Sequence, residues 1–421
     1  MAECSFLHTV SRRGFLKAVA AAGAGAALAV LPSRNAWAML PPGIRITGLK
    51  TFPVGNRVFV KVYTNEGVTG LGEGSLTGRA ATVKAAIEEH ERLLIGRNPT
   101  EIELLWQQMF RWPRARGGPM LNAALSAVDI ALWDILGKLL DVPIHKLLGG
   151  PARRRIRLYT HVRGQTPEVL AEQTLKAKAD GFNAVRSGLA FQRGLTVKRP
   201  WDIKHAVSLI EAIRKAAGDN VDIIDDTHGM LTADRVLEYA RAIEQYRLLF
   251  LEDPTLPDDL GALRWIGSHT AIPLAIGESL YGKQAFREVI HERLVSFVRP
   301  DAIHVGGISE TRKVAAMAEA NHISVSLHVA PSPVSNLAAA HVAAAATNCT
   351  IVENTARPAQ QSQQTRDLFK GGDITIENGY AALPDKPGLG CDLDEALADK
   401  IPYRPNDLPR FEFDDGSVSD Y

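Results

Sequence analysis

The feature that most constrains the fold is a series of short apolar runs, each ended by a polar residue. These polar residues are Asp226, Glu252, Glu278, Asp301, His328 and Glu353. Successive members are 23 to 27 residues apart, which is the length of a strand, a loop and a helix together. Residues 248–251 are apolar at every position, as expected for a strand covered on both faces. Because the carboxyl ends of parallel strands meet at one mouth, the pattern predicts a (β/α) barrel with functional groups at that mouth.

The chain of 421 residues is long enough for a second domain beside the barrel. Three strand-like runs followed by helical patterns predict an N-terminal α+β capping domain at residues 39–155. Eight strands, counted from the run at residue 156, predict a modified (β/α)8 barrel at residues 156–372. Residues 373–421 carry strand patterns again, and we expect this C-terminal segment to pack back on the capping domain.

Residues 1–38 have the features of an export signal. Arg12 and Arg13 precede an Ala/Gly-rich apolar run at residues 18–30, and Ala-Trp-Ala at 36–38 is a small-x-small cleavage signature. A membrane anchor is the alternative, but a run of about thirteen residues is too short to cross about 30 Å of hydrocarbon. We therefore expect a twin-arginine signal peptide, cleavage near Met39, and a periplasmic protein that keeps no membrane anchor.

Composition excludes some classes of partner. The 48 basic and 47 acidic residues give a net charge of +1, so neither a nucleic acid nor a charged membrane surface is expected to bind. Cys349 and Cys391 are the cysteines that remain after removal of the signal. The sequence leaves open whether they form a disulfide or stay as two buried thiols.

Three of the strand-end residues are carboxylates that should converge at the mouth. Asp226, Glu252 and Glu278 end consecutive predicted strands, and their charges would repel without a cation among them. Oxygen ligands suit Mg²⁺ or Mn²⁺ rather than Zn²⁺. The alternative is that these carboxylates pair with arginines or cap the following helices.

Two histidines are placed to exchange protons at the same mouth. His228 follows Asp226 by two residues and points to the same side if the strand continues. His328 ends the strand next to the one that precedes Asp301, and a carboxylate beside an imidazole fixes its tautomer and raises its basicity. One histidine can remove a proton on one side of the cation while the other delivers a proton on the opposite side.

These motifs resemble the enolase superfamily, in its mandelate racemase branch, and most of all the sugar-acid dehydratases of the D-galactonate dehydratase family. The resemblance covers residues 44–421 and rests on DTHG, LFLEDP, PLAIGES, RPDAIHVGGISE and SLH. It implies a Mg²⁺-dependent lyase that converts a sugar acid into a 2-keto-3-deoxy acid through an enediolate. It also implies a homo-oligomer, from a dimer to an octamer.

The resemblance implies a role for each site residue. The three carboxylates named above would bind Mg²⁺, His328 with Asp301 would be the base, His228 would protonate the departing 3-hydroxyl, and Glu353 would hydrogen-bond the substrate carboxylate. Loops at residues 76–79 and 114–117 match the lid of the family. This places Arg79 and Arg116 among the expected substrate-binding residues.

The second barrel strand departs from the family pattern. Relatives with a lysine base carry K-x-K there, whereas this chain has Arg186, Ser187 and Gly188, and residues 189–201 contain no tyrosine. Arg186 either binds substrate or forms an ion pair.

With His328 as the base, the resemblance implies that the substrates are 2R acids such as galactonate or gluconate. A racemase or epimerase with His228 as second base is the nearest alternative, and a non-catalytic periplasmic sugar-acid binder is a further one.

Overall fold

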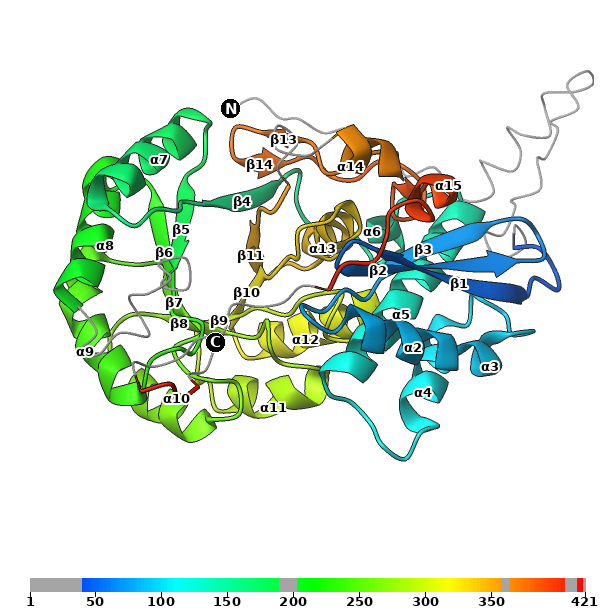
Figure 1. The fold of residues 1–421 in the computed structure, drawn as a ribbon, viewed down its shortest axis with the longest axis horizontal. Coiled ribbons are helices and arrows are strands. Elements are labelled where there is room, and N and C mark those ends of the chain that lie inside the picture. Colours follow the sequence, from blue (N-terminus) through cyan, green and yellow to red (C-terminus); the bar gives the residue numbers. More distant parts are fainter. Residues whose placement is uncertain (1–39, 189–202, 357–362, 406–414, 419–421) are drawn as a thin grey trace, which may run out of the picture. The chain divides into compact units, whose positions relative to one another are not determined.

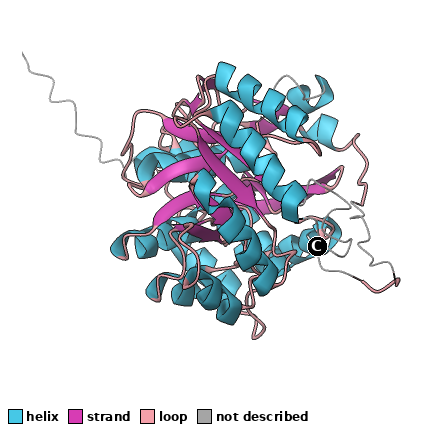
Figure 2. Ribbon diagram, turned by 90° about the vertical axis from the view of Figure 1, so that its left-hand side faces the viewer, coloured by secondary structure: helices cyan, strands magenta, loops and turns pink. Residues whose placement is uncertain are grey.

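Eight parallel strands close into a barrel in chain order, which confirms the predicted fold class (Figure 2). The computed structural model describes residues 40–188, 203–356, 363–405 and 415–418. The strands are β4 (Ile156–His161), β5 (Ala184–Gly188), β6 (Asp222–Asp226), β7 (Phe250–Glu252), β8 (Leu274–Ile276), β9 (Phe297–Val298), β10 (Ser324–Leu327) and β11 (Cys349–Glu353). β11 pairs with β4 through Val352↔Leu158 and Glu353↔Tyr159, and this pairing closes the sheet.

Helices connect successive strands and cover the outside of the barrel (Figures 1 and 2). They are α7 (Pro167–Ala179), α8 (Ile203–Ala217), α9 (Ala233–Ile243) with the 3-10 turn η3 (Glu244–Tyr246), α10 (Leu260–Gly267), α11 (Lys283–His291), α12 (Gly307–Ala320) and α13 (Pro333–Ala345), with the short α14 (Gln363–Leu368) after β11. Side chains of Thr166, Asp259 and Ser332 accept hydrogen bonds from the first turns of α7, α10 and α13, which is why these helices begin where they do.

The N-terminal residues form the expected α+β arrangement. Its antiparallel sheet contains β1 (Ile46–Val54), β2 (Arg57–Thr64) and β3 (Thr69–Glu73), in the order β1-β2-β3. Its helices are α2 (Ala80–Glu89), α3 (Glu91–Leu94), α4 (Ile102–Arg111), α5 (Pro119–Leu139) and α6 (Ile144–Leu147).

Helix α5 is the core of this N-terminal part. It is long and apolar enough to cross a membrane, but 78% of its most apolar window is buried inside the protein. Every second residue from Gly70 to Gly74, in β3 and just after it, is a glycine. Each of these glycines faces an alanine of α5: Gly70 faces Ala131, Gly72 faces Ala127, and Gly74 faces Ala123. The three alanines are one helical turn apart. A Cβ at any of these glycines would overlap the helix backbone. The sheet and the helix therefore pack backbone against backbone.

The opposite side of α5 is hydrogen-bonded to the barrel. Ser126 Oγ accepts from the backbone N–H groups of Gly306 and Gly307 at 2.8 and 2.9 Å. Asp129 accepts from the backbone N–H of Ser309 at 3.0 Å and from its hydroxyl at 2.5 Å. Both sets of bonds go to the start of α12, so α5 lies between the small sheet and a barrel helix (Figure 1).

The C-terminal segment contacts both parts of the fold. It contains β12 (Phe369–Lys370), β13 (Ile376–Glu377), β14 (Tyr380–Ala381), β15 (Asp392–Leu393) and α15 (Glu395–Ala398). β14 pairs with β4 of the barrel, while Lys61 of β2 forms ion pairs with Asp392 and Glu395 at 3.1 and 3.2 Å.

The domain boundaries stay a prediction, and the proposed signal peptide lies outside the described residues. Cys349 and Cys391 are buried free thiols.

Candidate active site

Three carboxylates meet at the carboxyl ends of neighbouring barrel strands. Asp226 ends β6, Glu252 ends β7, and Glu278 lies two residues after β8. Asp226 and Glu252 are direct partners in the β6–β7 register. Each of the three offers an oxygen within 4.8 Å of those of the other two. The strand ends therefore bring together the three residues that the sequence predicted as metal ligands.

Two buried arginines contact this carboxylate cluster. Arg186 in β5 donates from Nε to Glu252 at 3.0 Å, and its guanidinium also contacts Asp226. Arg299, which follows β9, pairs with Glu252 at 2.8 Å and with Glu353 at 3.2 Å. Burial lowers the pKa of Arg186, but Glu252 and Glu353 raise it above its usual value. Of the two roles considered for Arg186, the structure shows the ion pair, and a guanidinium held in this way stays charged.

The charge and donor type of the cluster fit a hard divalent cation. Within the part of the chain that the structure describes, the permanent positive charges paired with this group of five carboxylates, which includes Asp301 and Glu353, are the guanidiniums of Arg186 and Arg299. Arginine pairing therefore does not balance the carboxylate charge. Because every candidate ligand is an oxygen, the donor set suits Mg²⁺ or Mn²⁺.

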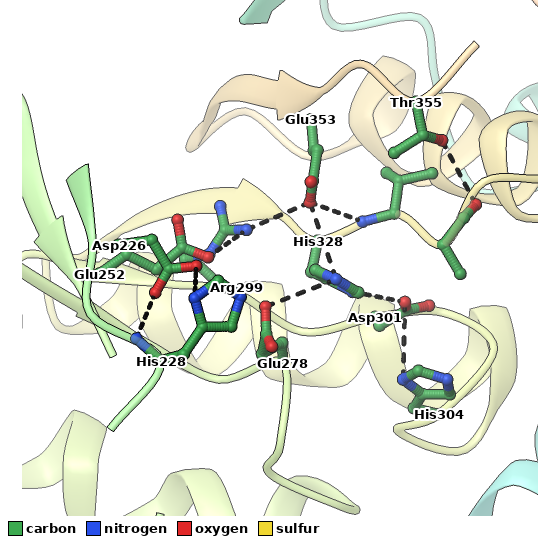
Figure 3. A network of polar contacts seen from close by, with 12 residues as sticks. Asp226, His228, Glu252, Glu278, Arg299, Asp301, His304, His328, Glu353 and Thr355 are labelled. Atoms are coloured by element: carbon green, nitrogen blue, oxygen red, sulfur yellow. Dashed lines mark hydrogen bonds and ion pairs between the residues drawn. The ribbon is translucent and has the colours of Figure 1, made fainter. Parts of the chain in front are cut away.

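His328 and Asp301 form a hydrogen-bonded pair beside this cluster (Figure 3). The two residues form a β-bridge just beyond β9 and β10, and His328 Nδ1 lies 2.6 Å from Asp301 Oδ2. Since the carboxylate accepts, Nδ1 carries the hydrogen and Nε2 faces the mouth. There Nε2 is 3.4 Å from Glu278 and 3.8 Å from Glu353.

The pKa of His328 depends on these neighbouring charges. Burial lowers it, but Glu278 and Glu353, with the hydrogen bond to Asp301, raise the pKa to about 10. A divalent cation held by Glu278 would offset part of that charge and so favour the neutral imidazole that a base requires.

His228 lies on the other side of the cluster, next to Asp226 (Figure 3). Its Nδ1 is 2.8 Å from Asp226 Oδ2, and its backbone N–H donates to Asp226 Oδ1 at 2.7 Å. The imidazole lies beside Asp226 as predicted, although the strand does not continue through residue 228: β6 ends at Asp226 and His228 has a left-handed φ of 47°. The turn, rather than strand alternation, returns the imidazole to the carboxylate.

Glu353 is held by several donors at the end of β11. His161 Nε2 lies 2.7 Å from one of its oxygens, and the other accepts from Arg299 and from the backbone N–H of Val329, both at 3.2 Å. Burial raises the pKa of Glu353, but His328 and His161 lower it well below its usual value. Contact with a substrate carboxylate stays a prediction for Glu353.

The sequence did not assign roles to His161 and Arg299, which the structure brings to the mouth. Arg299 stands two residues before Asp301, so strand alternation was the signal that could have placed it on the same side. Arg79 and Arg116 are exposed in loops. Their expected contact with substrate is not tested by the geometry of the described residues and stays a prediction.

Comparison with known proteins gives the family. Residues 29–149 match the mandelate racemase/muconate lactonizing enzyme N-terminal domain, and residues 169–397 match the enolase C-terminal domain-like family. The chain is 36% identical to a D-galactonate dehydratase of Ralstonia pickettii, over 90% of this chain and 100% of that protein. It is 34% identical to a D-mannonate dehydratase of Caulobacter sp. strain K31, over 87% of this chain and 96% of that protein.

A solved structure gives the same result. An enolase from Pantoea ananatis with bound D-gluconate and Mg superposes with a TM-score of 0.79 at 31% identity, and covers 85% of this chain and 95% of that one. Both domain families match in the expected order, and together they span most of the chain. The chain therefore belongs to the enolase superfamily, in the mandelate racemase/muconate lactonizing enzyme group.

Proposed function

We propose that this protein is a Mg²⁺-dependent sugar-acid dehydratase that converts an aldonate into a 2-keto-3-deoxy acid and water. The observation that carries the proposal is the Asp301–His328 pair, in which Nε2 of His328 faces the cluster of Asp226, Glu252 and Glu278. The relatives named as galactonate and mannonate dehydratases, and the structure with gluconate and Mg, support this substrate class.

The residues divide the reaction between two sides of the mouth. Asp226, Glu252 and Glu278 would hold the cation, which when bound supplies positive charge to the substrate carboxylate and to the enediolate formed after loss of the C2 proton. His328 Nε2 takes that proton, and Asp301 stabilises the resulting imidazolium through the 2.6 Å hydrogen bond.

His228 completes the elimination from the opposite side. It gives a proton to the 3-hydroxyl, the C3–O bond breaks, and water leaves with the electron pair of that bond. The enol that remains gains a proton at C3, loses its hydroxyl proton at C2 and so becomes the 2-keto-3-deoxy acid. Arg186 keeps its own proton, because its neighbours hold its pKa above the usual value, so it cannot replace His328 as base from the second strand.

Substrate configuration is the first test of this function. A single base on the His328 side reaches one configuration at C2, and we expect the purified protein with Mg²⁺ to dehydrate D-galactonate or D-gluconate but not D-mannonate. Formation of the 2-keto-3-deoxy product from each acid, measured in D₂O, checks this. Exchange of the C2 hydrogen without loss of water would identify an epimerase. Binding of Mg²⁺ and sugar acid with no turnover would identify a binding protein.

We also propose that the mature protein is exported to the periplasm by the twin-arginine route. Replacing Arg12 and Arg13 together by Lys is expected to leave the precursor in the cytoplasm, because that route reads the arginine pair. Cell fractionation, with N-terminal sequencing near Met39 for the wild type, measures the outcome. Unchanged periplasmic delivery would contradict export by the twin-arginine route.

We also propose that the mature protein is a homo-oligomer, as the family resemblance implies. Light scattering of the mature protein tests this.

A further inference from the structure

His304 lies between the N-terminal sheet and the Asp301–His328 pair. It is in the turn between β9 and α12, and its Nδ1 is 3.6 Å from Asp301 Oδ2, the oxygen that also accepts from His328. Its Nε2 is 2.8 Å from the carbonyl oxygen of Ser75, just beyond β3. One imidazole therefore lies between a backbone group of the N-terminal part and the carboxylate that orients His328. Figure 3 shows His304 beside Asp301 and His328.

The carbonyl of Ser75 determines where the hydrogen of His304 lies. A carbonyl oxygen only accepts, so Nε2 must donate to it. Nδ1 lies on the Asp301 side, 3.6 Å from Oδ2, which is too long for a hydrogen bond. The ring of His304 lies beside that of His328, with centroids 6.2 Å apart and planes inclined by 26°. The hydrogen bond to Ser75 fixes Nε2 of His304, and the ring of His304 adjoins the His328 ring that must stay oriented.

The turn that carries His304 is itself built around Asp301. The backbone N–H groups of His304 and Val305 donate to the Asp301 carbonyl at 3.1 and 2.8 Å, and that of Ile303 donates to Asp301 Oδ1 at 2.8 Å. A shift of His304 therefore moves the groups that bond both the backbone and the side chain of Asp301.

A second contact from the same segment reaches the other side of His328. Glu73 accepts hydrogen bonds from the hydroxyls of Ser75 and Ser332. Ser332 caps α13, four residues after His328. Residues 73–75 thus contact both the turn after β9 and the loop after β10. Because Asp301 and His328 lie on these two segments, the contacts fix both partners of the pair.

We propose that His304 is a positioning residue for the base: its ring, anchored by the carbonyl of Ser75, packs beside Asp301 and His328 and thereby holds His328 Nε2 toward the substrate. This inference rests on the proposed function, in which His328 removes the C2 proton. His304 does not contact Asp226, Glu252 or Glu278, so its effect is on the orientation of the base and not on the binding of the cation.

Kinetics of His304→Ala and His304→Gln test the proposal. We expect His304→Ala to lower kcat about 10- to 100-fold, as loss of an orienting partner does, with KM and Mg²⁺ affinity within about twofold of wild type. His304→Gln keeps an N–H that can donate to Ser75, so we expect it to retain most of kcat. His291→Gln, at an exposed position at the end of α11, is the matched control and should leave all three constants unchanged. Equal kcat for wild type and His304→Ala, or an equal loss in Ala and Gln variants, would overturn the proposal.

A spectroscopic readout keeps the test independent of turnover. A short Nδ1–H···O bond gives a low-field proton resonance, which ¹⁵N-histidine labelling detects and which His328→Asn should abolish. We expect the resonance in wild type and His304→Gln and a shifted or broadened one in His304→Ala. The same resonance in all three would overturn the positioning role. A different outcome would overturn the proposed function alone. In that outcome the wild type turns over no sugar acid, but the resonance still changes when residue 304 is replaced.

Discussion

Replacing His328 by Asn is expected to lower the rate of C2–H exchange by several orders of magnitude. A positioned base contributes about 10²- to 10⁴-fold, and its orientation adds more. Arg186, on the second strand, carries a guanidinium whose pKa is raised by Glu252 and Glu353 after burial lowers it. It stays protonated and cannot replace the imidazole as proton acceptor. Loss of deuterium incorporation at C2 in D₂O measures the effect directly.

His228→Asn is the matched control, because it alters the imidazole on the opposite side. We expect it to lose dehydration, since no acid protonates the 3-hydroxyl, while C2–H exchange with solvent continues at His328. Exchange that survives in His328→Asn but not in His228→Asn would show that the base lies on the Asp226 side of the mouth.

Removal of divalent cations should abolish activity, and added Mg²⁺ or Mn²⁺ should restore it. Glu252→Gln keeps the volume of the side chain but removes a charge that Arg186 and Arg299 both contact. We expect it to weaken Mg²⁺ binding at least about 100-fold, because a ligand contributes more than the outer contacts that typically cost 10- to 100-fold. Titration calorimetry measures the affinity, and circular dichroism checks that the variant is folded.

Glu377→Gln, on exposed β13, provides the control for this carboxylate substitution. It should bind Mg²⁺ and turn over substrate as the wild type does. Full activity of the protein after chelation would contradict both the metal site and the function built on it.

The barrel and its site residues could be predicted because they follow from local patterns. Apolar runs at a constant interval determine the βα units, and parallel strands place Asp226, Glu252 and Glu278 at one edge whatever the details of packing. The Asp301–His328 pair could also be predicted from the sequence. The two residues follow adjacent strands, and parallel pairing of those strands places them side by side in a β-bridge.

The remaining contacts depend on packing between distant segments. Ser75 and His304 are 229 positions apart, and nothing in either local sequence signals that a carbonyl meets an imidazole there. The sequence alone allowed Arg186 either to face a substrate or to form an ion pair. The structure shows the ion pair, because Glu252 and Asp226 are buried beside the guanidinium. Strand alternation likewise could not predict the left-handed backbone at His228. One residue of irregular backbone changes the direction of every side chain after it.

The packing of β3 on α5 limits how this enzyme can diverge. Gly70, Gly72 and Gly74 admit no side chain, and Ser126 and Asp129 tie the same helix to α12. A hinge motion of the whole sheet would separate these contacts at once. The loops at residues 76–79 and 114–117, for which substrate contact is predicted, lie outside this packing, so Arg79 and Arg116, both exposed, can change in length and charge without loosening the segment that holds His304.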